Sequence, residues 1–249
     1  MNTLQLDLNS HIWRVTLDRP QHGNALSAQL VTELDEVLAR AERDLPAAVI
    51  LAGSGRHFCT GFDLSDLAEE SDDTLLARFV RIELLLQRIA RAPYLTVAIA
   101  RGRAMGAGAD VFAACRLRLA EGNASFAFPG ASGFGLVLGT RRLAALVGSS
   151  TALNWIETGR GVPAAEAQRA GLVSAFLPNE QSIAEEVSQQ LNMPTHMAAA
   201  LRSAIEPEAG MNDAKDLERL VRSAALPGLR DRISTYVQRA MAARLTVTD

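Results

Sequence analysis

The sequence predicts an α/β fold, and two observations support this prediction. In the first part of the chain, short apolar runs alternate with longer segments in which apolar residues recur at helical spacing. After about residue 143, almost every segment has the amphipathic spacing of a helix. The chain has 249 residues, of which 48% are hydrophobic and 21% charged, so it can bury one substantial core and carry a smaller appendage.

Three elements are expected near the N-terminus. Residues 11–20 alternate between apolar and polar side chains and stop at a proline, which is typical of a strand. Residues 27–44 begin with Ser27, a favourable capping residue, and their leucines and valines share one face of a helix. Residues 48–53 form a short apolar run that ends in glycine, which indicates a buried strand.

The same alternation continues through the middle of the chain. Residues 72–93 predict a long amphipathic helix that a proline ends. Residues 95–100 predict a second buried strand, and the small-residue segment after it opens a helix that runs to about Ala114. Residues 116–120 alternate again and predict a further strand. In folds of this class, ligands collect where strand ends lead into helix starts.

The later part of the chain is predicted to be mostly helical. Short helices punctuated by glycine are expected at residues 142–148, 150–159 and 163–171, followed by a strand at residues 172–178. From about residue 180 to residue 243, nearly everything has the pattern of amphipathic helix. A helical segment of this size often packs on neighbouring subunits.

Composition excludes several classes of protein. The net charge of −3 offers no attraction to nucleic acid or to an anionic membrane surface, and no apolar run is long enough to span a membrane. The N-terminus lacks the pattern of a signal peptide, and two isolated cysteines do not form a disulfide framework. We therefore expect a cytoplasmic protein. The four histidines show no metal-ligand spacing, so no metal site is expected.

The segment "GRAMGAGADVF" at residues 102–112 consists largely of glycine and alanine, whose small side chains leave the backbone accessible. Asp110 then follows among apolar neighbours. One interpretation is tight packing of a helix against a sheet, with Asp110 as a capping or solvated residue. The other is a site in which backbone N–H groups at a helix start hold an anion, with a carboxylate one turn further on. A dinucleotide site is disfavoured because the third glycine of GxGxxG is missing.

The segment "GSGRHFCTGFDLSDL" at residues 53–67 also follows a buried strand, and its glycines allow backbone conformations that other residues rarely adopt. It is either a plain strand-to-helix turn with Asp63 or Ser65 as the cap, or a loop that presents N–H groups inward. Two N–H donors aimed at one point would stabilise an oxyanion or enolate, and losing one typically costs about 10² to 10³ in rate. A nearby carboxylate could then exchange a proton with the polarised substrate.

Five segments in the right order resemble the crotonase superfamily, the enoyl-CoA hydratase/isomerase group. Each is only moderately specific by itself, but together they cover almost the whole chain. The segments are "LDRPQHGNALS" (17–27), "AVILAGSGRHFCTGFDLSDL" (48–67), "APYLTVAIARGRAMGAGADVFAACRLRLA" (92–120), "LGTRRLAALVG" (138–148) and "TGRGVPAAEAQRAGLVSAFLP" (158–178).

The resemblance implies a spiral of ββα turns with a C-terminal helical domain, divided as a core at residues 1–190 and an oligomerisation domain at residues 191–249. It implies a homotrimer or a dimer of trimers that binds acyl-CoA thioesters, as in fatty acid metabolism, without a metal or redox cofactor. By motif position, the N–H groups of Phe62 and Ala107 would polarise the thioester carbonyl. The other residues that the resemblance places at the substrate are Ala25, Leu26, Thr60, Leu64, Gly106, Phe128 and Gly130.

The acid positions depart from the pattern of the family's hydratases. The resemblance implies that those hydratases carry a glutamate at each of two positions. Here the first position is Asp110 and the second is Gly130, with no neighbouring acid before Glu157. A dienoyl-CoA isomerase branch is similar at the first position but keeps the later glutamate. The phenylalanines at 126, 128 and 134 suggest a drier, more aromatic pocket than water addition needs, although they could equally be core residues.

Three hypotheses follow from these departures. The first is an acyl-CoA lyase or isomerase of the hydratase/isomerase type that works through an enolate, with Asp110 as the single acid/base. The second is another reaction on the same scaffold, such as thioester hydrolysis, decarboxylation or carbon–carbon cleavage, to which His57 or Asp63 could contribute. The third is a non-catalytic acyl-CoA-binding protein.

Overall fold

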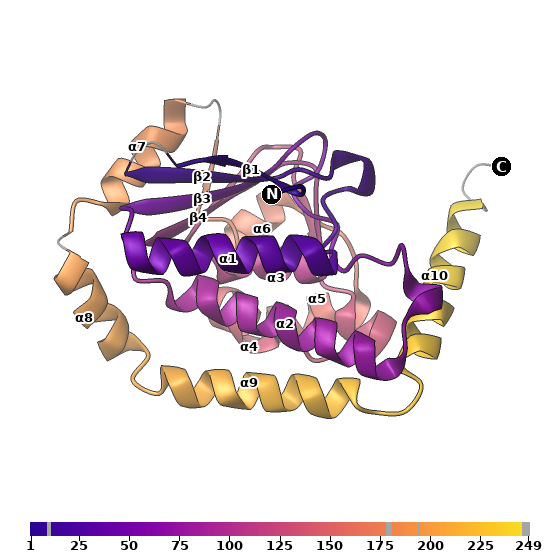
Figure 1. Ribbon diagram of the computed structural model, residues 1–249. Coiled ribbons are helices and arrows are strands. Elements are labelled where there is room, and N and C mark those ends of the chain that lie inside the picture. Colours follow the sequence, from indigo (N-terminus) through magenta and orange to yellow (C-terminus); the bar gives the residue numbers. More distant parts are fainter. Residues whose placement is uncertain (9–10, 178–180, 194, 246–249) are drawn as a thin grey trace.

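A six-stranded sheet forms the centre of the computed structural model, which describes residues 1–8, 11–177, 181–193 and 195–245 (Figure 1). Strand β1 pairs antiparallel with β2, and the other neighbours in the sheet are parallel. The strand order is β1-β2-β3-β4-β6-β9. The strands are β1 Leu4–Asp7, β2 Ile12–Leu17, β3 Ala48–Gly53, β4 Leu95–Ala100, β6 Leu117–Ala120 and β9 Ala175–Phe176.

A second, smaller sheet has the order β5-β7-β8 and lies beside the start of helix α3. Its strands are β5 Arg103–Met105, β7 Ser125–Ala127 and β8 Val162–Pro163. The α-helices are α1 Ala28–Asp44, α2 Asp72–Arg91, α3 Ala107–Ala114, α4 Thr140–Val147, α5 Ser149–Thr158, α6 Ala164–Ala170, α7 Gln181–Gln190, α8 Thr195–Ile205, α9 Ala209–Ala224 and α10 Leu229–Leu245. Three short turns of other helix types are η1 Pro20–His22, η2 Leu67–Glu69 and the π-helical η3 Gly130–Phe134.

The elements predicted in the first half of the chain are confirmed, with small shifts at their ends. All residues of β3 and β4 are buried, as expected for central parallel strands covered on both faces. Helix α1 begins after Ser27, whose side chain accepts a hydrogen bond from the Leu30 N–H at 3.1 Å. Helices α1 and α2 lie together on one face of the sheet (Figure 1).

Two expectations differ from the structure, and one sheet was not expected. The strand expected at residues 172–178 is reduced to β9, which pairs only with β6, and residue 178 lies outside the described residues. Neither Asp63 nor Ser65 caps a helix, because the next helical turn, η2, starts after Asp66. The second sheet was not predicted, since strands of two or three residues are too short to show a periodic pattern.

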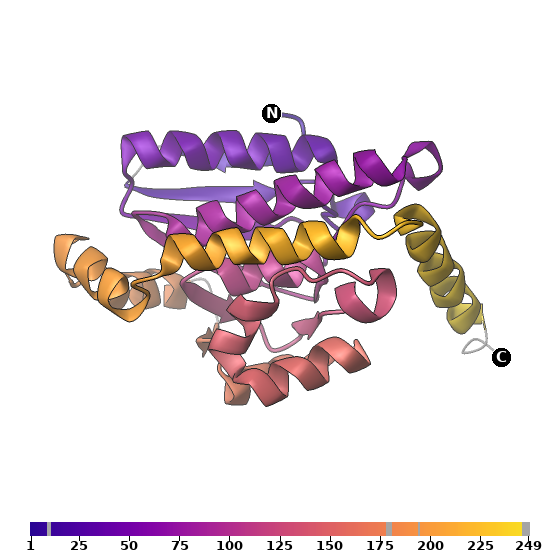
Figure 2. The same cartoon turned by 90° about the horizontal axis from the view of Figure 1, so that it is seen from below.

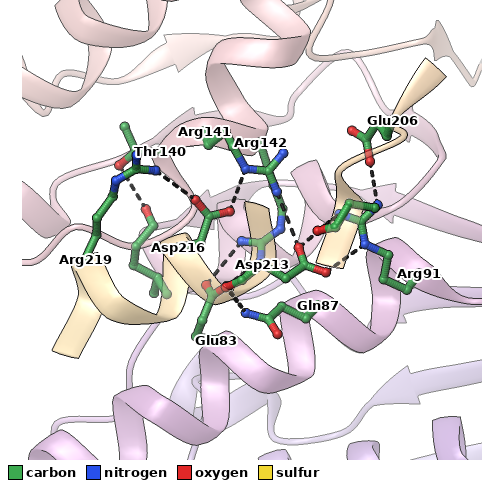
Figure 3. Close-up of polar contacts among 12 residues, drawn as sticks. Glu83, Gln87, Arg91, Thr140, Arg141, Arg142, Glu206, Asp213, Asp216 and Arg219 are labelled. Carbon is green, nitrogen blue, oxygen red and sulfur yellow. Dashed lines mark hydrogen bonds and ion pairs between the residues drawn. The ribbon is translucent and has the colours of Figure 1, made fainter. Parts of the chain in front are cut away.

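Helix α9 runs across α2 on the side away from the sheet (Figures 1 and 2). Two of its carboxylates hold it there, as Figure 3 shows: Asp213 accepts from Arg91 of α2 at 2.7 Å, and Asp216 accepts from Arg141 of α4 at 2.8 Å. Helix α9 therefore ties α2 to α4 through ion pairs.

Helix α10 is anchored at its start by Asp72, the first residue of α2. The Asp72 carboxylate accepts hydrogen bonds from the backbone N–H groups of Gly228, Leu229 and Arg230, at 2.8, 3.1 and 2.8 Å. The ends of α9 and α10 also contribute buried side chains to the main core. The division of the chain at residue 190 stays a prediction.

Candidate active site

Two glycines of the small-residue segment at 102–112 have different structural roles. A Cβ atom on Gly108 would lie 2.4 Å from the Cys59 carbonyl oxygen, so this glycine lets α3 pack closely against the 53–67 loop. Gly106 has open space around it but a φ of 51°, a backbone conformation that glycine adopts readily. Gly108 is therefore needed for packing, while Gly106 turns the chain into the start of α3.

The backbone N–H groups of Phe62 and Ala107 form no hydrogen bond within the part of the chain that the structure describes. The two segments that carry them are in direct contact, because a Cβ atom on Gly61 would lie 2.6 Å from the Met105 oxygen and 3.6 Å from the Ala107 nitrogen. Ala107 is also the first residue of α3, where N–H groups have no partner inside the helix. Both residues line the same cavity.

Two buried polar side chains hold the 53–67 loop in place. Asn24, with a φ of 56°, donates to the carbonyls of Ser54 and His57 at 2.9 and 2.8 Å. Asp63 accepts from Arg19 at 2.6 Å and from the N–H and hydroxyl of Ser65 at 3.0 and 2.6 Å. Burial favours a raised pKa for Asp63, but the hydrogen bonds from Ser65 and the Arg19 charge outweigh it and lower the pKa below its usual value.

Asp110, the fourth residue of α3, differs from Asp63 in having no such partners. Its side chain is 6% exposed and faces the cavity, and its carboxyl group accepts no hydrogen bond from any described residue. The carboxyl group lies against Gly139 at the start of α4, where a Cβ atom would come within 2.1 Å of Oδ1. Burial raises the pKa of Asp110 well above its usual range, against the opposing charge of Arg142.

A buried ion pair provides the charges nearest to Asp110. Arg142 of α4 forms two hydrogen bonds with Glu83 of α2, one of them at 3.1 Å (Figure 3). The Arg142 Nε atom is buried without a hydrogen-bond partner among the described residues. Since Glu83 neutralises most of the Arg142 charge, this pair offsets the desolvation of Asp110 only in part.

The cavity has a volume of about 120 Å³, and most of its wall is apolar. Its lining residues are Thr60, Gly61, Phe62, Leu64, Phe79, Met105, Gly106, Ala107, Asp110, Phe128, Pro129, Gly130, Ala131, Phe134, Leu136, Leu138, Gly139, Thr140, Leu143, Ile156 and Tyr236. All of the predicted site residues except Ala25 and Leu26 are among them.

Ala25 and Leu26 are not among the residues that line this cavity, and their place along a CoA channel stays a prediction. The Leu26 N–H donates to the Gly61 carbonyl at 2.7 Å, and the Ala25 carbonyl accepts from Arg19 at 2.8 Å. Both side chains are buried. These two residues therefore support the loop that carries Phe62.

Two other candidates, His57 and Phe126, have roles in the framework, and the next acid after Gly130 lies outside the site. His57 accepts a hydrogen bond at Nδ1 from the Arg103 N–H at 3.1 Å and does not line the cavity. Phe126 is fully buried in the core beside Phe112, with ring centroids 4.8 Å apart, whereas Phe128 and Phe134 do line the cavity. The Glu157 side chain is exposed on α5 and is not part of the wall.

The sequence did not point to Phe79 of α2 or Tyr236 of α10 as lining residues. Both belong to long amphipathic helices, where an aromatic residue is normally read as part of the packing face. No local signal could have identified them, because only the folded chain brings α2 and α10 to this cavity.

No helix among the described residues is long and apolar enough to cross a membrane. Nor do His, Cys, Asp and Glu side chains in the described ranges gather into a group that could hold a metal ion.

The model of the enoyl-CoA hydratase/isomerase family matches residues 7–223 of the chain. The chain is 32% identical to the short-chain-enoyl-CoA hydratase of Clostridium acetobutylicum over 209 residues, which cover 77% of this chain and 76% of that protein. It is 28% identical to the 2,3-dehydroadipyl-CoA hydratase of Escherichia coli over 257 residues, covering 96% of this chain and 97% of that protein.

A crystal structure from Bordetella parapertussis, assigned to the enoyl-CoA hydratase/isomerase group, superposes with a TM-score of 0.89. It is 39% identical in sequence, and the match covers 94% of this chain and 98% of that one. The fold is that of the crotonase enzymes. The chain belongs to the enoyl-CoA hydratase/isomerase family.

Proposed function

We propose that this protein is an acyl-CoA enzyme in which the N–H groups of Phe62 and Ala107 polarise a thioester carbonyl and Asp110 is the single acid/base. One observation carries the proposal: two N–H groups and one buried carboxyl group, all without protein partners among the described residues, line one cavity. Elsewhere a folded protein satisfies such groups, because leaving them unpaired costs free energy.

The mechanism that this arrangement supports is enolate formation. Negative charge that develops on the thioester oxygen is stabilised by the two N–H donors, each worth about 10² to 10³ in rate. Asp110, once ionised, removes a proton from the substrate carbon next to the carbonyl and can return it at another carbon. A raised pKa suits this role because a carboxyl group exchanges protons most effectively near its own pKa.

Gly130 favours proton transfer over water addition. A Cβ atom there would meet only the Leu136 carbonyl oxygen, at 4.0 Å, so the second acid position is open space. Apart from Asp110, no carboxylate lines the described cavity. Isomerisation needs one proton carrier, whereas addition of water uses an acid and a base, so we propose isomerase-type chemistry as the principal activity.

The alternatives differ in what they need from the site. Thioester hydrolysis, decarboxylation or carbon–carbon cleavage would use the two N–H groups without a second carboxylate, and a binding protein would use them without chemistry. Assembly as a trimer or dimer of trimers, the oligomerisation role of residues 191–249 and a cytoplasmic location remain predictions.

The test is exchange of substrate α-protons in heavy water, followed by mass spectrometry on a panel of saturated and unsaturated acyl-CoAs. We expect exchange with the wild type and its loss in Asp110→Asn, and the accompanying products would name the reaction. Tight thioester binding without exchange or product would contradict the enolate mechanism and leave a binding protein or a reaction that does not involve the α-carbon.

Gly130→Glu tests why water addition is disfavoured. Because the position opens into the cavity, the introduced carboxylate can supply the missing acid/base group, and we expect hydration of a short 2-enoyl-CoA to rise by about 10² or more. Gly130→Gln, of matched size but without charge, is the control. Equal hydration rates in the wild type and both variants would show that the glycine does not limit this reaction.

A further inference from the structure

Four aromatic rings form one continuous wall of the cavity, which we call the aromatic wall: Phe62, Phe79, Phe134 and Tyr236. Phe62 stacks on Phe79 with ring centroids 4.3 Å apart. Phe79 meets Phe134 at 6.3 Å, and Phe134 meets Tyr236 edge to face at 5.2 Å. The wall therefore runs from the loop that carries one unpaired N–H group to the C-terminal helix α10.

Contacts behind the aromatic wall hold its two ends in place. At one end, the Arg78 guanidinium lies 4.1 Å from the centre of the Phe62 ring and is itself bound to Glu70 at 2.6 Å. At the other end, the ring of Tyr236 packs on the backbone of Gly133, where a Cβ atom would come within 2.7 Å of the ring. Arg232, one turn earlier in α10, donates to the Phe134 carbonyl at 2.9 Å. These contacts hold the rings at both ends of the aromatic wall in defined positions.

One polar group stands on this wall. The Tyr236 hydroxyl makes no hydrogen bond to any described residue, although its ring is held on two sides. Tyr236 is partly exposed, so solvent can serve this hydroxyl in the unliganded protein. The Tyr236 hydroxyl is therefore available to a polar atom of a bound molecule.

The volume of the cavity is close to that of a site for one aromatic ring. An apolar cavity of about 150 Å³ in a protein interior binds one benzene molecule. The cavity here, at about 120 Å³, is of that order, so one aromatic ring is of a size to fill it. Flat rings gain additional attraction from aromatic neighbours, about 0.5–1.5 kcal/mol for each pair.

We propose that the cavity takes the acyl group of an aryl acyl-CoA, with its ring against the aromatic wall and a hydrogen-bonding substituent on that ring bound to the Tyr236 hydroxyl. The proposal rests on the proposed function only in that the ligand is a CoA thioester. It names the acyl group, which the family does not specify.

The test compares equilibrium binding of three saturated esters to the full chain: hydrocinnamoyl-CoA, its para-hydroxy counterpart and the straight-chain acyl-CoA of equal carbon number. In the wild type, we expect the phenyl ester to bind about tenfold more tightly than the straight-chain ester. The para-hydroxy ester should gain roughly a further fivefold. Free CoA serves as the reference for contacts outside the acyl site.

Two variants separate the parts of the proposal. Phe134→Leu should reduce the preference for the phenyl ester over the straight-chain ester to about twofold. Binding of free CoA, which does not occupy the acyl site, should stay unchanged and reports that the variant is folded. Tyr236→Phe keeps the ring and should remove only the gain from the para-hydroxyl group. Similar affinities for all three esters in the wild type would overturn the proposal, as would a para-hydroxyl gain that persists in Tyr236→Phe. Binding of no CoA ester would instead refute the proposed function.

Discussion

Asp63 and Asp110 are two buried aspartates in the segments that line the cavity, and they differ in their hydrogen-bond partners. Each follows a backbone N–H group that lacks a partner, at Phe62 and at Ala107, and each is 6% exposed. Asp63 is bound by Arg19 and Ser65 and its pKa is lowered, whereas Asp110 has no bound partner among the described residues and its pKa is raised. One carboxylate is fully satisfied and the other is left for a ligand.

The difference shows how a functional carboxylate can be recognised in this fold. Burial, charge and position near the site are shared by both residues, so none of these distinguishes them. What distinguishes them is hydrogen bonding: the chain supplies three donors to Asp63 and places an apolar wall and Gly139 against Asp110. The following substitutions test that distinction in order of expected effect.

The largest difference is expected in the rate of α-proton exchange. Asp110→Asn should reduce it by about 10² to 10⁴, because the amide cannot take up the proton. Asp63→Asn should leave it within a few-fold at temperatures where the variant is folded. Exchange measured by mass spectrometry at matched folded protein concentration checks this, and similar losses in both variants would mean that the two aspartates have similar roles.

Stability should respond in the opposite order. Asp63→Asn leaves the half-buried Arg19 without its counter-charge and should lower the free energy of unfolding by about 2–3 kcal/mol. Asp110→Asn removes a desolvated acid with no hydrogen bonds to lose, so it should be neutral or stabilising. Urea unfolding of both variants measures this, and a large loss in Asp110→Asn would reveal a structural partner of that residue.

Gly139→Ala should disturb Asp110 directly. The new Cβ would lie 2.1 Å from Oδ1 of Asp110 on a backbone with a φ of 66°, so we expect about a tenfold loss of exchange with a stability cost of about 1–2 kcal/mol. Gly148→Ala at the other end of α4 is the matched control, since it has a φ of 81° but open space. If both variants lose exchange equally, the contact with Asp110 is not the cause.

The smallest effect is on the pH dependence of stability, and its sign should differ between the two residues. The unfolded chain has aspartate pKa values near 3.9. Because the folded pKa of Asp63 is lower, its stabilisation is present above about pH 4 and is lost as the pH falls through the folded value. Because the folded pKa of Asp110 is higher, stability declines as the pH rises from about 4 through that value.

Each pKa difference of one between the folded and unfolded chain corresponds to about 1.4 kcal/mol. The unfolding free energy of Asp110→Asn should therefore rise relative to that of the wild type as the pH increases above about 4, because the variant lacks the ionisation of a buried acid. An unchanged profile in that variant would contradict the raised pKa.

The elements of the fold that the sequence could predict are those with an apolar run of six residues or a long helical pattern. Strands β3 and β4 and helices α1 and α2 each contain six or more residues with a consistent apolar face, and they were located within about two residues. The strands of the second sheet have two or three residues, and their pairing depends on contacts between distant segments. Such pairing leaves no local pattern.

The site was predictable to the extent that it lies in motifs. The resemblance pointed to Phe62, Ala107, Asp110 and Gly130, and the cavity brings these four together. It did not indicate that Leu26, which does not line this cavity, donates a hydrogen bond to the loop that carries Phe62. Nor could it indicate Tyr236, which reaches the cavity only because Asp72 and Gly133 seat the helix α10 there.

The seating of α10 also bears on when the cavity forms during folding. Its wall joins residues from 60 to 236, and Asp72 meets the start of α10 at a sequence separation of 156 residues or more. Contacts between such distant segments form late, after the chain entropy of the intervening loop has been lost. We therefore expect substitutions on this wall to speed unfolding and to leave the folding rate nearly unchanged, so that ligand binding protects the enzyme mainly by lengthening the lifetime of its folded state.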